Sequence, residues 1–366
     1  MKSKIGVGLI GCGNISEAYL KAAVQFPIID MISCADVNAD AAQVKAVEYG
    51  IDAQSVDELL ADPRIDIVLN LTTPQHHVDI GVQALSAGKH TYSEKPLALS
   101  TEQAEILVQL SRQSSLRVGC APDTFLSGAH QTARYAIDSH QIGKPVSGTA
   151  FMMGPGHESW HPDPDFYYQS GGGPLMDMGP YYLTALVDLL GPVESVVGAA
   201  KAAFDTRAIG SGARKGELFP VEVPTHISGI LNFENGAMVT ITTSFDVPKH
   251  NHSPLEIYGT HGSLLAGDPN KFEREVKVAQ KNGEWETIEQ KHLYGDGNYR
   301  ILGLVDMAHS IVSDRPHRAS LELSLHVLEI MEKILASAET ETVLYLKHGC
   351  QRPAPMPTHL AFGHLE

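Results

Sequence analysis

The chain has 366 residues, 43% of them hydrophobic and 19% charged, which is ordinary for a globular protein long enough to form two domains. Its 43 acidic and 27 basic residues give a formal net charge of −16, which argues against nucleic acids and anionic membranes as partners. The sequence has no apolar run of the roughly 20 residues that span a bilayer, no signal-peptide pattern and no CxxC spacing among its four cysteines, so we expect a protein of the reducing cytoplasm.

Short apolar runs alternate with amphipathic stretches over roughly the first 120 residues. The stretches between the apolar runs have the spacing of helices. This alternation predicts a parallel sheet with right-handed crossovers. The segments that we expect to form its strands are 4–11, 31–37, 66–72, 90–94 and 116–121.

The first predicted strand runs into a glycine-rich turn. Gly11 allows a tight turn, Gly13 lets the backbone approach a pyrophosphate, and Ser16 stands where a dinucleotide fingerprint usually has its third glycine. Asp36 ends the second strand about 20 residues later, as a ribose-binding carboxylate does. No arginine follows it closely, which favours NAD over NADP. The alternative is a glycine turn in another doubly wound sheet. The residues of this region expected to bind the cofactor are Gly11, Gly13, Asn14, Ile15 and Asp36.

Two further segments follow predicted strands, at the sheet edge where ligands bind in such folds. In the first, either His76 or His77 caps the next helix or reaches the nicotinamide ribose. In the second, Lys95 is placed to bind a ribose or a substrate hydroxyl, and the alternative is an exposed lysine in a turn. The residues of these segments expected to contact the cofactor are Thr72, Thr73, Pro74, His77, Glu94 and Lys95.

The sequence pattern changes in the second half of the chain. Residues 225–245 form two β-rich runs joined by Glu-Asn-Gly, a strong signal for an antiparallel hairpin. Residues 154–170 have the composition of a pocket wall, with Trp160 offering an aromatic face to a sugar ring. Two of the histidines have HxxxH spacing, but Pro162 and Pro164 interrupt any helix that would present both to a metal, so we expect none. The predicted substrate contacts are His157, Trp160, His161, Asp165 and Tyr168.

The segment GGGPLMDMGPYYL, residues 171–183, combines glycines, prolines and one carboxylate. If a helix begins near Pro174, Asp177 and Tyr181 lie on one face as an i,i+4 pair, and Pro180 lies inside the helix. Alternatively the helix begins at Pro180. In the non-functional interpretation, the segment is only the start of a helix and Tyr181 packs in the core.

These motifs, in this order, resemble the Gfo/Idh/MocA oxidoreductase family, named for glucose–fructose oxidoreductase and inositol dehydrogenase. Lys95 matches the lysine of the family's EKP motif, and Asp177 matches the aspartate of its glycine-rich motif. Where the family usually has histidine, this sequence has Tyr181, as in the branch that resembles glucose–fructose oxidoreductase and dihydrodiol dehydrogenase.

The resemblance implies an α/β protein with two domains. Residues 1–122 are expected to form the NAD-binding Rossmann domain, a doubly wound parallel sheet. Residues 123–366 are expected to form an α/β domain for substrate binding and oligomerisation, with a large open, mostly antiparallel sheet. The resemblance also implies a sugar or cyclitol substrate and a homo-oligomer, a dimer or tetramer, assembled through that sheet.

Oxidation of a secondary alcohol moves a hydride to the nicotinamide while a base removes the hydroxyl proton. We therefore expect Tyr181 to act as general base, Lys95 to lower the pKa of that phenol, and Asp177 to orient the sugar. Pairing of Lys95 with Asp177, with Tyr181 left to pack, is the competing mechanism. Two rival functions are a redox-neutral glycosidase that retains NAD and a non-catalytic NAD-binding regulator.

Overall fold

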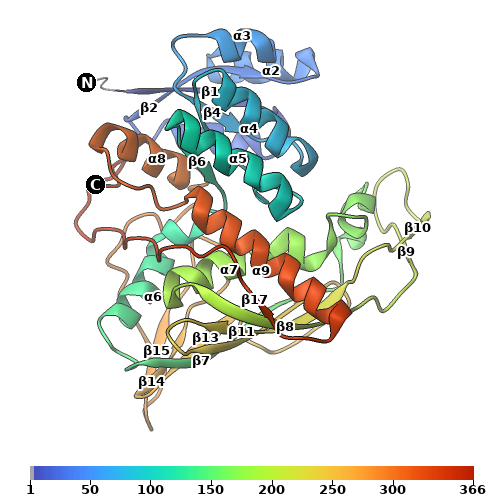
Figure 1. Cartoon of the computed structure of the whole chain (residues 1–366), viewed down its shortest axis with the longest axis vertical. Helices are drawn as coiled ribbons and strands as arrows, with labels where there is room; N and C mark the ends of the chain where they lie inside the picture. The colour runs from blue at the N-terminus through green and yellow to red at the C-terminus, as the bar shows by residue number, and fades with distance from the viewer. Residues whose placement is uncertain (1–3) are drawn as a thin grey trace. The chain divides into compact units, whose positions relative to one another are not determined.

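The computed structural model describes residues 4–366, and the chain folds into two compact units (Figure 1). Within the described residues, the first unit contains 4–131, 290–328 and 353–366, and the second contains 132–289 and 329–352. The predicted boundary after residue 122 treats everything that follows as one domain, whereas 290–328 and 353–366 pack with the first unit. Hydrogen bonds between distant segments explain the difference, because the buried Asp123 carboxylate accepts the Ile301 N–H at 2.9 Å.

The first unit is built on a six-stranded parallel sheet in the order β3-β2-β1-β4-β5-β6, the doubly wound arrangement that the sequence predicts. The two-residue β3 is the strand that the sequence did not predict. The strands are β1 (Ile5–Ile10), β2 (Ile29–Ala35), β3 (Asp52–Ala53), β4 (Ile67–Asn70), β5 (His90–Ser93) and β6 (Val118–Cys120). The helices are α1 (Ser16–Ala23), α2 (Ala39–Tyr49), α3 (Val56–Ala61), α4 (His77–Ser86), α5 (Thr101–Ser114) and α8 (Leu302–Ser313), with short 3-10 turns η1 (Pro74–His76) and η2 (Thr124–Leu126).

The second unit is built on a nine-stranded sheet in the order β16-β15-β14-β13-β7-β12-β11-β8-β17. Only the β7–β12 pair is parallel, so the sheet is mostly antiparallel. The predicted hairpin is confirmed as β11 paired with β12. The strands are β7 (Pro145–Met153), β8 (Val193–Lys201), β11 (His226–Phe233), β12 (Met238–Ser244), β13 (Leu255–Gly259), β14 (Gly262–Leu265), β15 (Lys277–Gln280), β16 (Glu286–Thr287) and β17 (Leu344–Tyr345). A separate two-stranded sheet pairs β9 (Thr206–Ala208) with β10 (Leu218–Pro220).

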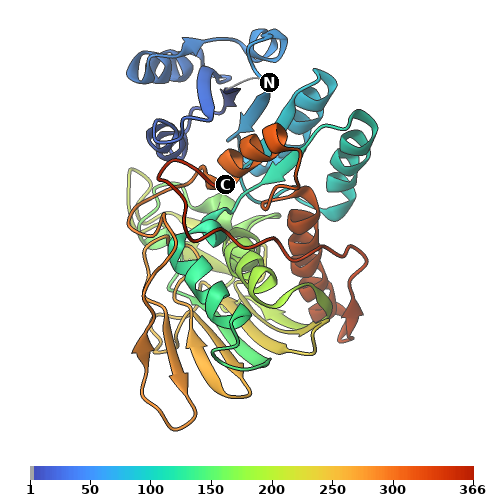
Figure 2. The ribbon, with the colours of Figure 1, turned by 90° about the vertical axis from the view of Figure 1, so that its left-hand side faces the viewer.

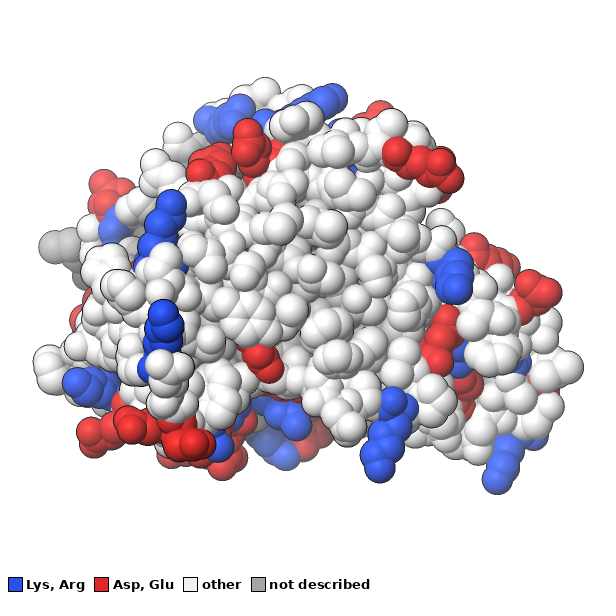
Figure 3. Space-filling view, turned by 90° about the horizontal axis from the view of Figure 1, so that it is seen from below, with Lys and Arg blue, Asp and Glu red and all other residues white. Residues whose placement is uncertain are grey.

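Helices cover one face of this nine-stranded sheet (Figures 1 and 2). The helices are α6 (Gly128–Asp138), α7 (Gly173–Leu190) and α9 (Leu321–Thr340), with 3-10 turns η3 (His157–Ser159) and η4 (Asp165–Tyr168) in the loop before α7. Gly198 and Gly229 lie beneath Ile334 of α9, where a Cβ atom at Gly198 would collide with the helix backbone. Seen from the opposite side, the face over the sheet is largely without charged side chains, which gather around its rim (Figure 3).

Candidate active site

The glycine-rich turn joins β1 to α1 in the first unit. Gly11 has φ of +103°, and its N–H donates to the Ala35 carbonyl at 2.9 Å. Ser16 is fully buried at the third glycine position, and its hydroxyl donates to the Gly13 carbonyl at 2.7 Å. Gly13 and Asn14 are exposed, and no side chain caps the start of α1. The turn therefore offers its backbone to an anionic group at a helix N-terminus, which fits the pyrophosphate of a dinucleotide.

Asp36 follows β2 and is tied to the same turn. One carboxylate oxygen accepts the Cys12 N–H at 2.8 Å, and the other accepts the Asn38 N–H at 2.8 Å. The carboxylate thus lies beside the glycine turn, where a ribose-binding acid is needed.

We expect Asp36→Ala to weaken NAD binding by about 10- to 100-fold, since a hydrogen bond to a charged group contributes roughly 1.5–3 kcal/mol. The binding of NADP should weaken much less, because the carboxylate gives its 2′-phosphate no favourable contact. Fluorescence titration with NADH and NADPH measures both affinities, and the exposed Asp40→Ala serves as the matched control. Equal losses for the two cofactors would remove the ribose role.

The segment after β4 carries four of the predicted cofactor contacts, and the structure removes His77 from this set. Thr72 and Pro74 are half-buried and Thr73 is exposed, so these three residues remain candidates for cofactor contact. His77 is only 1% exposed, and its ring nitrogens lie 2.6 Å from the Pro96 carbonyl and 3.0 Å from the Thr72 carbonyl. Burial lowers its pKa. His77 links two loops of the protein, so we do not place it in the cofactor site.

The loop after β5 carries Glu94 and Lys95. Glu94 accepts hydrogen bonds from the buried Tyr19 hydroxyl at 2.8 Å and from the Lys95 N–H at 2.9 Å. These bonds engage both carboxylate oxygens. Glu94 therefore fixes the backbone that presents Lys95, a positioning role that the sequence did not reveal.

Asp123 is a buried carboxyl of the first unit that follows β6. One of its oxygens accepts the N–H groups of Ile301 and Gly303 at 2.9 and 3.0 Å. Burial raises its pKa to about 6, although these hydrogen bonds oppose the shift. The folded protein therefore keeps this carboxyl protonated to a higher pH than the unfolded chain does.

This shift predicts a pH dependence of stability. The contribution of Asp123 to the free energy of unfolding is fully present below the unfolded pKa near 4 and falls by about 3 kcal/mol as the pH rises to 7. Asp123→Asn should abolish this part of the pH dependence. Urea unfolding of both proteins at pH 4 and pH 7 measures it, with the exposed Asp30→Asn as control. If the free energies of unfolding of wild type and Asp123→Asn differ by the same amount at pH 4 and at pH 7, the prediction is wrong.

In the second unit, α7 begins at Gly173, with Pro174 in its first turn and Pro180 inside it. The helix start near Pro174 is therefore the correct alternative. Asp177 and Tyr181 occupy i and i+4 positions, which lie on one face of a helix. Tyr181 is 8% exposed and Asp177 is half-buried. The Nε2 atom of His157 lies 3.0 Å from a carboxylate oxygen of Asp177, so the loop before α7 supplies this acid with a partner.

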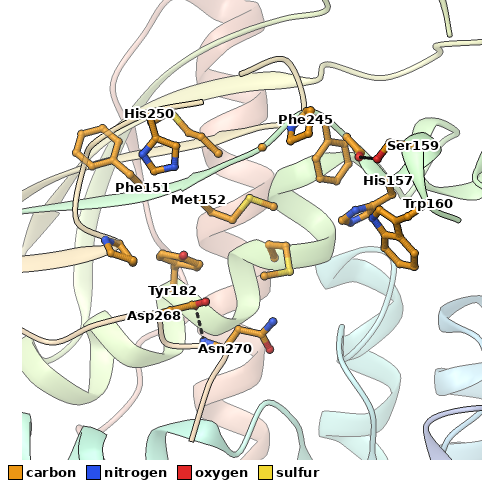
Figure 4. A pocket seen from close by; sticks show the side chains of 16 residues that line it. Phe151, Met152, His157, Ser159, Trp160, Tyr182, Phe245, His250, Asp268 and Asn270 are labelled. Carbon is orange, nitrogen blue, oxygen red and sulfur yellow. Dashed lines mark hydrogen bonds between the residues drawn. The ribbon is translucent and has the colours of Figure 1, made fainter. Parts of the chain in front are cut away.

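Two of the five predicted substrate residues, His157 and Trp160, line a cavity of about 450 Å³ in the second unit (Figure 4). Trp160 is 59% exposed, and its ring meets the His157 ring edge to face at 5.3 Å. The sequence predictions did not include the other side chains of this cavity, although Tyr182 follows Tyr181 directly and His250 lies in the segment KHNHS, residues 249–253. The lining side chains that the sequence missed include Phe151, Met178, Tyr182, His250, Asp268 and Asn270.

The other three predicted substrate residues make contacts with other residues of the protein. Tyr168 is fully buried against Phe245, and its hydroxyl donates to Glu158, so it belongs to the core. The Asp165 carboxylate accepts hydrogen bonds from Arg214 at 2.7 and 3.0 Å, which lowers its pKa. His161 accepts the N–H of Asp163 at 3.1 Å and does not line the cavity. The spacing of polar residues in the loop did not reveal these internal partners.

Arg207 fixes the loop that carries the cavity wall. Its guanidinium donates to Glu158, the neighbour of His157, and to Asp246, and it also donates to the Phe245 carbonyl at 3.1 Å. The side chains of Arg207 and Asp246 are each 7% exposed and that of Glu158 is 13% exposed, so the network lies largely out of water. These contacts tie the loop that carries His157 and Trp160 to the Phe245–Asp246 segment.

Two family models match the chain. One describes an oxidoreductase family with an NAD-binding Rossmann fold and matches residues 5–121, and the other describes the GFO/IDH/MocA C-terminal domain and matches residues 130–265. The chain belongs to the GFO/IDH/MocA oxidoreductase family. It is accordingly an oxidoreductase whose N-terminal fold binds NAD, as its glycine turn and Asp36 predict.

Several curated relatives of this oxidoreductase are named as enzymes that act on a sugar or a polyol. The 1,5-anhydro-D-fructose reductase of Ensifer adhaerens is 26% identical over 76% of this chain and 81% of its own length. Levoglucosan dehydrogenase of Pseudarthrobacter phenanthrenivorans is 25% identical over 82% and 84%. Inositol 2-dehydrogenase of Rhizobium meliloti is 25% identical over 75% and 79%.

Solved structures share the fold of this oxidoreductase. Levoglucosan dehydrogenase in complex with NADH and levoglucosan aligns with a TM-score of 0.80 at 22% identity, over 93% of this chain and 99% of that one. An NAD-binding oxidoreductase from Klebsiella pneumoniae aligns with a TM-score of 0.83 at 22% identity, over 94% and 99%.

Across residues 4–366 of this oxidoreductase, no three His, Cys, Asp or Glu side chains are grouped so that they would hold a metal ion. Within the same residues, no helix is long and apolar enough to cross a bilayer. Lys95 belongs to the first unit, and Asp177 and Tyr181 belong to the second. The meeting of these three side chains therefore stays a prediction.

Proposed function

We propose that this oxidoreductase is an NAD-dependent dehydrogenase that oxidises a secondary hydroxyl of a sugar, sugar derivative or cyclitol. The observation that carries the proposal is the arrangement on α7, where Tyr181 and Asp177 are one helical turn apart and Asp177 is bonded to His157. The names of the curated relatives support a carbohydrate or polyol as the substrate class.

NAD, when bound, accepts the hydride from the carbon that is oxidised. We assign the general base to the Tyr181 phenol, which takes the proton of the substrate hydroxyl. Lys95 donates a hydrogen bond to that hydroxyl, and its positive charge favours the ionised phenol. Asp177 accepts a hydrogen bond from a neighbouring hydroxyl and so orients the ring, while His157 holds the Asp177 carboxylate in place.

The proposal is tested by incubating the purified protein with NAD or NADP and a panel of aldoses, cyclitols, anhydrosugars and glycosides, and by recording the absorbance of the reduced nicotinamide. We expect NADH to form with one class of substrate. Retained NAD together with release of an aglycone and no net NADH would instead identify the redox-neutral glycosidase. Bound NAD without turnover of any compound would identify the regulator.

We propose a homo-oligomer, a dimer or tetramer, that assembles through the face of the nine-stranded sheet opposite the helices. The largely uncharged face in Figure 3 supports this proposal, because interface centres are depleted of charge. Ile230 and Met238, which point to that face by strand alternation, are 39% and 51% exposed. Light scattering in solution is expected to give the mass of a dimer or tetramer, and a monomer would contradict the proposal.

We also propose that the protein works in the cytoplasm. The free state of its four cysteines, Cys12, Cys34, Cys120 and Cys350, supports this proposal, since a reducing compartment keeps thiols unpaired. Cell fractionation is the direct measurement.

A further inference from the structure

The cavity of about 450 Å³ in the second unit lies between the end of β7, helix α7 and the loop after β14 (Figure 4). Figure 4 shows two polar ends with an apolar middle. His157, Ser159 and Trp160 form one end, and Asp268 and Asn270 form the other near Tyr182. Such a combination of apolar walls and a few placed polar groups is typical of a small-molecule site.

The cavity begins next to the proposed catalytic pair but does not include it. Asp177 and Tyr181 do not line it, whereas Met178 and Tyr182, the next residues of α7, do. His157 connects the two regions, because it lines the cavity and is bonded to Asp177 at 3.0 Å. The cavity is therefore space beyond the place that the reacting hydroxyl must occupy.

The volume of the cavity is that of a site for a larger ligand. Pockets for drug-sized molecules have volumes of about 300–1,000 Å³, and this cavity falls within that range even without the space beside Asp177 and Tyr181. If the substrate were a single sugar ring held at Asp177, the cavity would contain only water. A substrate with a second group attached to the oxidised ring would fill it.

The far end of the cavity presents polar groups suited to hydroxyls. One Asp268 carboxylate oxygen accepts the Asn270 N–H at 3.0 Å, which fixes the orientation of that carboxylate. Burial and then the neighbouring Asp268 raise the pKa of Tyr182, so its phenol stays neutral. His250 also lines the cavity, and its imidazole can donate or accept a hydrogen bond.

We infer that this cavity binds a second sugar ring, and that the substrate of the proposed dehydrogenase is a disaccharide rather than a monosaccharide. The oxidised ring lies at Asp177 and Tyr181. The second ring lies in the cavity, with its C–H faces against Phe151, Met152 and Met178 and its hydroxyls toward Asp268, Asn270 and His250. This inference rests on the proposed function for the identity of the reaction, while the cavity itself can be tested by binding.

The test compares a methyl glycoside with a disaccharide that carries the same oxidised ring. We expect kcat/KM to be at least about tenfold higher for the disaccharide, the difference that one or two added hydrogen bonds supply. His250→Phe keeps an aromatic ring and removes both nitrogens, and Asn270→Ala removes the amide. Each should lower kcat/KM for the disaccharide by about tenfold and leave the methyl glycoside within about twofold of wild type.

Calorimetric titration of the NADH complex with the disaccharide measures the same contacts without turnover. Asp205→Asn, an exposed acid of the same unit, is the matched control, and thermal unfolding verifies that each variant is folded. Equal kcat/KM for the two sugars would overturn the second-ring site and leave the dehydrogenase intact. Disaccharide binding that depends on His250 but gives no NADH would support the site and overturn the proposed reaction. Preference for an aryl glycoside over every disaccharide would overturn the sugar ring as the occupant.

Discussion

Tyr181→Phe is expected to lower kcat by about 100- to 10,000-fold, the range that a positioned general base contributes. The substitution removes one oxygen from a side chain that is 8% exposed on α7, so the helix keeps its packing. The affinity for NADH should stay near that of wild type, because the glycine turn and Asp36 belong to the other unit. Steady-state kinetics and fluorescence titration with NADH give the two values.

Tyr135→Phe on α6 is the matched control, since Tyr135 is a 39% exposed phenol and its loss should leave both values unchanged. Turnover by Tyr181→Phe at the wild-type rate would show that this phenol is not the base. The competing mechanism would then apply, in which Lys95 pairs with Asp177, and Lys95→Met should carry the large loss of kcat instead.

The first sheet could be predicted from the sequence because its signals are local. Strands β1 and β4 come from short, mainly apolar runs, and both are buried at every position. The two-residue β3 carries no such signal, since both of its residues are exposed. The return of residues 290–328 to the first unit depends on distant partners such as the buried Asp123, which local patterns do not reveal.

The candidate site was predictable where one element carries it. The sequence offered a common face for Asp177 and Tyr181 as one of two alternatives, and the start of α7 at Gly173 selects it. The sequence did not show that Tyr168 packs in the core against Phe245 or that His77 contacts the Pro96 carbonyl, because Phe245 and Pro96 come from other segments. The far end of the cavity was missed for the same reason, since Asp268 and Asn270 stand on a loop that no motif marks.

Two substitutions in the glycine turn separate folding from cofactor binding. A Cβ atom at Gly13 would meet no atom within 4 Å, whereas one at Gly11 would lie 2.6 Å from the Leu71 carbonyl carbon at a φ of +103°. Gly13→Ala should therefore unfold at the wild-type temperature, while Gly11→Ala should lose roughly 1–3 kcal/mol from its free energy of unfolding because of backbone strain.

The effect on NADH binding should be large for Gly13→Ala. Its new methyl group points into the open space through which a pyrophosphate approaches the turn, and loss of two hydrogen bonds to a charged group corresponds to at least about 100-fold in affinity. Thermal unfolding and NADH titration of both variants measure stability and affinity independently. If Gly13→Ala binds NADH as tightly as wild type, the pyrophosphate does not rest on this turn. If it binds weakly while its unfolding temperature is unchanged, the loss lies in the contact with the cofactor, because no atom of residues 4–366 outside the turn itself lies within 4 Å of the new methyl group.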